Sequence, residues 1–69
     1  MKKDAFPISL LRLREVMTRT GLSRARVYQL QHQRLFPQSF RLAGGRAVAW
    51  RSDEIAEWIE QQPRSRAAA

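Results

Sequence analysis

Apolar residues recur at helical spacing in three parts of the chain. The three stripes are Leu13, Val16 and Met17; Val27 and Leu30; and Ile55, Trp58 and Ile59. They predict helices over about residues 14–20 and 24–33, and a third helix that stops before Pro63. Because helices this short are unstable alone, we expect them to be held by packing against one another.

The junction between the first two predicted helices has the signature of a helix-turn-helix. Gly21 can end a helix because it adopts a left-handed conformation without a Cβ clash, and Ser23 can cap the amides that open the next helix. The apolar residues expected to complete the contact between these helices are Leu11, Leu22, Leu35 and Phe36. The side chains of the second helix outside its apolar stripe suit a DNA groove.

Residues 38–51 predict a β-hairpin, because Pro37 forbids further helix and two glycines follow a short apolar run. Two registers are possible. A two-residue loop at Gly44-Gly45 would pair Leu42 with Ala47 and would mix polar and apolar residues on both faces of the hairpin.

A three-residue loop over residues 43–45 is the register that we prefer, because it gathers the large apolar side chains on one face. That face carries Phe40, Leu42, Val48 and Trp50. In this register Arg46 lies at the tip of the hairpin. The residues that would then face solvent or a partner are Arg41, Ala47 and Ala49.

The start of the third helix carries capping signals. Ser52 is a good N-cap, and Asp53 and Glu54 in the first turn complement the helix dipole. Trp50 and Trp58 could stack on single-stranded nucleic acid, but both lie on predicted inward faces, so we interpret them as core residues.

Length and composition restrict the class of protein. A chain of 69 residues forms one small domain of modest stability, without room for a catalytic cleft of ordinary depth. With no cysteine and one histidine, we expect no disulfide, metal site or cofactor. No apolar run reaches the length of a membrane span and no signal peptide is evident, so we expect a cytoplasmic protein.

The charge is strongly positive and unevenly distributed. The formal net charge is +7, and eleven of the thirteen basic residues are arginines. Residues 1–51 carry a balance of +9, whereas residues 52–62 carry −4. Arginine binds phosphate and guanine with a planar fork of donors, so this distribution predicts a polyanionic partner and an acidic third helix that faces away from it.

The chain resembles the AlpA-like prophage regulators, which belong with the excisionases and the MerR-type winged helices. The resemblance covers about residues 10–60 without gaps. It rests on Leu13-Arg14-Glu15-Val16, Thr20-Gly21-Leu22-Ser23, Val27-Tyr28, Leu30, Phe36-Pro37, Gly44-Gly45-Arg46-Ala47-Val48, Trp50-Arg51-Ser52-Asp53-Glu54-Ile55 and Trp58. It implies a mainly α, α+β winged helix-turn-helix, with three helices and a two-stranded hairpin wing between the second and third.

The resemblance also implies a regulator that places its second helix in the major groove of double-stranded DNA and its wing at the neighbouring minor groove. The candidate residues of the recognition helix are Ser23, Arg24, Ala25, Arg26, Tyr28, Gln29 and His32. The candidate wing residues are Arg41, Gly44, Gly45 and Arg46, and the candidate phosphate contacts are Arg14 and Arg51. Arginine can read guanine, glutamine can read adenine, and an arginine at a wing tip can enter a narrow minor groove.

Three positions depart from the family pattern. Arg34 replaces a glycine at the end of the second helix, so either it adopts a left-handed conformation at about 1 kcal/mol or the helix ends differently. Gln31 replaces an aliphatic residue, which makes the inner face wetter or places it against a neighbouring protomer. Arg26 replaces a small hydroxyl residue and either contacts phosphate or lies along the helix.

We therefore expect a flexible arm over residues 1–9, a DNA-binding domain over residues 10–62 and a flexible tail over residues 63–69. The function expected is sequence-specific transcription regulation without catalysis. The alternatives are an excisionase-like protein whose adjacent copies bend DNA, an adaptor that also contacts RNA polymerase, and general nucleic-acid binding. Neither a membrane nor a small-molecule substrate is expected as a partner.

Overall fold

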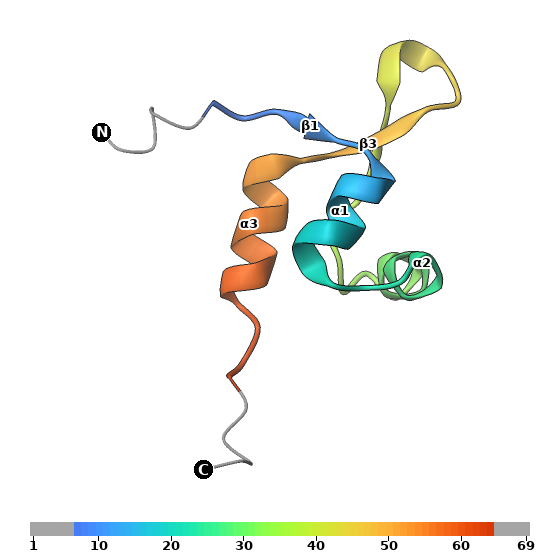
Figure 1. The fold of residues 1–69 in the computed structure, drawn as a ribbon. Coiled ribbons are helices and arrows are strands. Elements are labelled where there is room, and N and C mark those ends of the chain that lie inside the picture. Colours follow the sequence, from blue (N-terminus) through green and yellow to red (C-terminus); the bar gives the residue numbers. More distant parts are fainter. Residues whose placement is uncertain (1–6, 65–69) are drawn as a thin grey trace.

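The computed structural model describes residues 7–64 and shows three helices and a small antiparallel sheet (Figure 1). In chain order the elements are β1 (Leu10–Leu11), α1 (Leu13–Thr20), α2 (Arg24–His32), β2 (Phe40–Arg41), a 3-10 turn (Leu42–Gly44), β3 (Val48–Arg51) and α3 (Ser52–Glu60). The predicted α+β, mainly helical architecture with a hairpin between α2 and α3 is confirmed. None of the helices in the described part of the chain is long and apolar enough to cross a membrane.

The core lies between the three helices and β3. Its buried residues are Leu11, Val16, Val27, Leu30, Phe36, Trp50 and Ile55, and Leu13, Met17, Leu22, Val48 and Trp58 pack against it. The helical residues of this set are those of the predicted apolar stripes, except that Ile59 of the third stripe is 38% exposed. Leu35, which was expected in the contact between the first two helices, is 60% exposed, whereas its neighbour Phe36 is buried.

The helix-turn-helix junction forms as its residues dictate. Gly21 has φ 79° and donates its backbone N–H to Met17 O at 2.8 Å, which closes α1. The Ser23 hydroxyl accepts a hydrogen bond from the Arg26 backbone N–H at 3.1 Å, which caps α2. Both predicted caps are confirmed.

The end of α2 explains the exposed Leu35. Arg34 has φ 63°, so the left-handed conformation is the alternative that occurs. Arg34 N–H donates to Gln31 O at 3.0 Å and Leu35 N–H donates to Leu30 O at 2.8 Å, which is the Schellman pattern. Because the chain changes direction at Arg34, Leu35 points outward and Phe36 is buried in the core.

The preferred hairpin register is wrong. Phe40 pairs with Ala49, Arg41 pairs with Val48, and Leu42 N–H donates to Ala47 O at 2.8 Å. The apolar residues are therefore not gathered on one face: Phe40 is 44% exposed.

The turn, and not the apolar alternation, decides this register. Ala43 and Gly44 have φ 50° and 73°, and Gly45 N–H donates to Leu42 O at 2.8 Å. Two consecutive left-handed residues form the kind of turn that matches the twist of a hairpin. The strand pairing is therefore the one expected from the two-residue loop, although the left-handed residues are Ala43 and Gly44 and not Gly44 and Gly45. Ala49 is completely buried instead of facing solvent.

A third strand, β1, was not expected. It pairs antiparallel with β3 through Leu10 with Arg51 and Leu11 with Trp50, so that β3 is the central strand of the order β1-β3-β2. Two residues are too few to show a period, and their partners lie far along the chain.

The expected N-cap role of Ser52 is wrong as well. Ser52 is the first residue of α3, and its hydroxyl accepts a hydrogen bond from the Ser9 backbone N–H at 2.9 Å. Ser52 N–H in turn donates to Ser9 O at 2.8 Å. This pair of bonds extends the pairing of β1 with β3 and fixes Ser9 against the start of α3. Asp53 and Glu54 lie in the first turn of α3, as predicted.

Candidate nucleic-acid interface

The outward face of α2 carries most of the candidate residues. Because Val27 and Leu30 anchor the helix in the core, the other side of α2 is left to solvent. The candidate residues exposed there are Ser23, Arg24, Ala25, Arg26, Tyr28, Gln29 and His32. The structure thus brings the seven together at the start and along one side of a single helix.

Arg24 lies over the ring of Tyr28, which in turn lies beside Trp50 at the base of the wing. The Arg24 guanidinium lies 5.7 Å from the centroid of the Tyr28 ring, and that ring lies 6.3 Å from the Trp50 ring at an interplanar angle of 54°. Trp50 is fully buried, whereas Tyr28 is 36% exposed. Stacking uses the flat face of a guanidinium and leaves its N–H edge able to donate to another acceptor.

Arg26 and Gln29 are joined to each other. Arg26 Nη1 donates to Gln29 Oε1 at 2.6 Å, one turn along the exposed face of α2. Arg26 therefore lies along the helix surface. The Gln29 amide oxygen is occupied in this state, while its amide nitrogen has no protein acceptor among the hydrogen bonds of residues 7–64.

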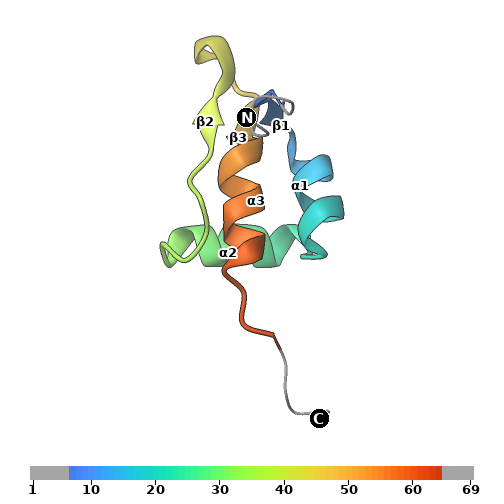
Figure 2. The ribbon, with the colours of Figure 1, turned by 90° about the vertical axis from the view of Figure 1, so that its left-hand side faces the viewer.

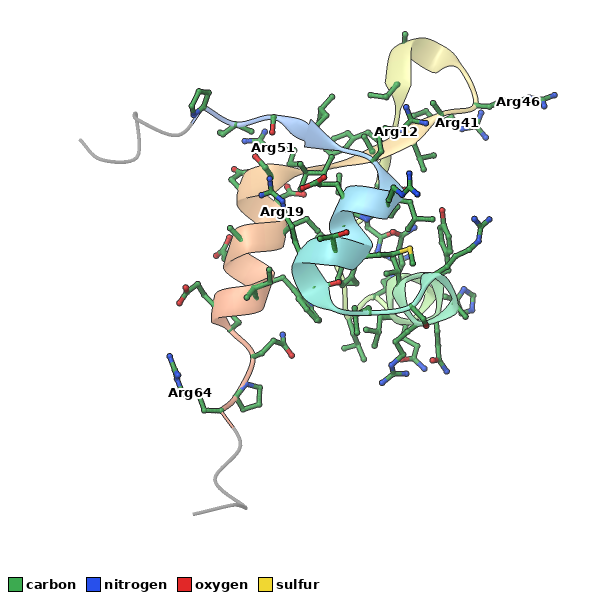
Figure 3. All side chains as sticks on the ribbon, in the orientation of Figure 1. Arg12, Arg19, Arg41, Arg46, Arg51 and Arg64 are labelled. Atoms are coloured by element: carbon green, nitrogen blue, oxygen red, sulfur yellow. The ribbon has the colours of Figure 1, made fainter. Side chains whose placement is uncertain are left out.

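The wing presents its cations on the same side of the molecule as α2. Figure 3 shows Arg41 and Arg46 reaching toward that side, together with Arg12 at the start of α1. Gly44 and Gly45 form the tip, where Gly44 has φ 73°. All five residues are exposed.

Sequence reasoning missed Arg12. It lies outside both the helix-turn-helix and the hairpin motifs, because it is the extended residue that precedes α1. The only sequence signal was its place in the basic block of residues 1–51. Its position beside the wing appears only when β1 brings the start of α1 to β3.

The two phosphate candidates differ in their surroundings. Arg14 is exposed at the start of α1. Arg51 donates from Nε and Nη2 to the two carboxylate oxygens of Asp53, at 2.9 and 2.8 Å. These bonds lower the pKa of Asp53 and raise that of Arg51, because each charge favours the other. A phosphate would have to compete with this carboxylate.

The acidic helix lies on the other side of the molecule. In Figure 2, which shows the side opposite the wing cations, α3 stands in front and the segment between α2 and β2 runs beside it. Residues of both line an open hollow of about 890 Å³, among them Glu54, Glu57, Leu35 and Trp58. Among residues 7–64, no group of three histidine or acidic side chains could hold a metal ion.

Comparison with known proteins identifies a family that the sequence matches. Residues 9–64 match the family described as "Prophage CP4-57 regulatory protein (AlpA)". The chain is 43% identical over 49 residues to the ORF88 protein of Enterobacteria phage P4. The matched region covers 71% of this chain and 54% of that protein. The match thus spans about half the length of the phage protein.

The chain is also 33% identical over 61 residues to the DNA-binding transcriptional activator AlpA of Escherichia coli (strain K12), which covers 80% of this chain and 86% of that protein. No solved structure matches the chain. Because the family match takes in nearly all of the described residues, the chain belongs to the AlpA family of prophage regulatory proteins.

Proposed function

We propose that this protein binds specific sites on double-stranded DNA and regulates transcription there, with α2 in the major groove and the wing at the neighbouring minor groove. The observation that carries the proposal is the separation of charge across the fold. The exposed face of α2 and the wing arginines lie on one side, and the carboxylates of α3 lie on the other. A duplex can approach the first side without meeting the acidic helix.

The α2 face supplies the base readers in this proposal. Arg24 is held near the N-terminus of the helix with its donor edge available, which suits bidentate donation to O6 and N7 of guanine. Gln29 can read adenine once its oxygen is released by Arg26, which then becomes available to a phosphate.

The wing and the start of α1 supply the backbone contacts. Arg46 and Arg41 suit a narrow minor groove or its phosphates, and Arg12 and Arg14 suit the strand between the two grooves. None of these four takes part in an ion pair within the described residues. Arg51 contributes less, because two of its N–H groups already donate to Asp53.

Selection of bound duplexes from a random pool, with the full chain and at physiological salt, tests the proposal. We expect a short sequence to be enriched and footprinting to show protection in adjacent major and minor grooves. We also expect that site to be favoured over random duplex by the ~10³-fold or more typical of specific binders. Enrichment of no sequence, with equal affinity for all duplexes, would leave only general nucleic-acid binding.

Substitutions at Tyr28 test whether its ring supports Arg24 or its hydroxyl donates to a phosphate. Because its ring lies near both Arg24 and Trp50, we expect the ring and not the hydroxyl to contribute to affinity. Tyr28→Phe should therefore keep site affinity within about twofold, whereas Tyr28→Leu should lose roughly tenfold, the order of one cation–π contact plus one ordered arginine. Fluorescence anisotropy with the selected duplex measures both. An equal loss in the two variants would instead identify the hydroxyl as a phosphate donor.

A second role as an adaptor is favoured by the hollow beside α3, where Glu54 and Glu57 accompany exposed apolar surface away from the DNA side. RNA polymerase is the partner that such a role requires in a transcriptional activator. Glu54→Lys with Glu57→Lys should leave DNA affinity unchanged or slightly higher and should abolish activation of a reporter. Activation that survives the double reversal would show that this surface is not used.

A further inference from the structure

The indole of Trp50 joins the recognition helix to the wing. Its Nε1–H is shared between two acceptors, Gln31 Oε1 at 3.0 Å and Pro37 O at 3.1 Å. Gln31 belongs to α2, whereas Trp50 belongs to β3, the strand that leads back from the wing tip. It is the shorter of the two side-chain to side-chain hydrogen bonds between α2 and residues 38–51 in the described part of the chain, and both involve Gln31.

Gln31 links the position of β3 to the exposed face of α2, because it binds the same Trp50 indole that Tyr28 packs against. It lies one turn after Tyr28, whose ring also packs against Trp50. The same amide reaches Ser39 Oγ at 3.5 Å, beside the start of β2. Gln31 therefore makes directional contacts with two residues of the segment 38–51.

We propose that Gln31 is a positioning residue for DNA recognition: by holding the Trp50 indole, it fixes the wing relative to α2 so that both elements reach their grooves together. This rests on the proposed function. A wing already held at the required angle gives up less conformational entropy on binding, so each wing contact contributes more to affinity. Arg46 at the tip is the residue whose contribution depends on this.

The fold itself does not depend on the Gln31 bond. In Gln31→Leu the Trp50 N–H keeps Pro37 O as its acceptor, so no buried donor is left without a partner. Gln31→Glu keeps an acceptor for the indole and serves as the conservative variant. Gln38→Leu is the matched control, because Gln38 bonds to Gln31 O and Phe36 O in the same segment but does not touch the indole.

The test is a double-mutant cycle between Gln31 and Arg46, measured as affinity for the selected duplex. No hydrogen bond joins these two residues among those of residues 7–64, and substitutions at distant, independent sites combine to within about twofold. We expect the loss of affinity caused by Arg46→Ala to be smaller in the Gln31→Leu chain than in the unmodified chain, by a factor of more than about two. In chains that carry Gln31→Glu or Gln38→Leu instead of Gln31→Leu, Arg46→Ala should cause the same loss of affinity as in the unmodified chain.

A second measurement needs no DNA. The indole N–H resonance of Trp50 should move in Gln31→Leu, while that of Trp58, which donates to Leu35 O at 2.9 Å, should stay in place. An unmoved Trp50 resonance would overturn the proposal.

The failures can be told apart. Equal losses from Arg46→Ala in both chains, or an effect of Gln38→Leu as large as that of Gln31→Leu, would overturn the positioning role while DNA recognition stands. If Arg46→Ala has no effect in the unmodified chain, the wing is not part of the interface. That result would overturn both the positioning role of Gln31 and the proposed placement of the wing on DNA.

Discussion

Replacing Trp50 with alanine is expected to abolish the folded state. Trp50 is fully buried at the junction of α2, β1 and β3, and its indole satisfies Gln31 and Pro37. Removing a buried tryptophan costs about 3–5 kcal/mol, which is most of the stability of a domain this small. Thermal unfolding followed by circular dichroism should therefore show no cooperative transition.

Leu35→Ala is the control for the loss of an apolar side chain. Because Leu35 is 60% exposed, we expect its truncation to change the free energy of unfolding by no more than about 0.5 kcal/mol. A cooperative transition in Trp50→Ala, close to that of Leu35→Ala, would contradict the placement of Trp50 at the centre of the core.

Arg24→Ala carries the largest expected effect on recognition. If Arg24 donates to a guanine, its removal should cost about 1–3 kcal/mol of discrimination between the selected site and random duplex, with the fold intact. Competition binding at one salt concentration measures the ratio of the two affinities. The effect should concentrate at one base position, so duplexes altered there should no longer be distinguished.

Arg19→Ala is the matched control for the lost positive charge. Arg19 is exposed on a helix as Arg24 is, but it pairs with Glu15 and lies away from the wing arginines. We expect its removal to lower both affinities equally and slightly. Should Arg24→Ala behave in the same way, Arg24 contacts phosphate and does not read a base.

The sequence predicted the features that depend on neighbouring residues. Gly21 and Ser23 cap their helices by bonds within one turn, and the apolar stripes mark the core because helical period alone places them on one face. The exposed face of α2 follows from the same period. For these features a single sequence contains the needed physical information.

The features that the sequence did not predict depend on distant partners or on turn geometry. The hairpin register was set by the left-handed Ala43, a residue that gives no warning of that conformation. The strand β1 and the position of Arg12 depend on pairing with a segment about 40 residues later. For Gln31 the sequence left open a wetter inner face or a contact with a neighbouring protomer, because its acceptor role needs the Trp50 indole, which local patterns do not bring to it.

The pairing of Leu11 with Trp50 has a consequence for the order of events during synthesis. The helix-turn-helix leaves the ribosome well before β3 does, yet it lacks a covered apolar face until β3 and α3 arrive. We therefore expect the nascent chain to stay unfolded until the residues of α3 have emerged, and a chain truncated before them to give no folded fragment. We expect the exposed face of α2, the wing and the acidic surface of α3 to form together, in one cooperative step.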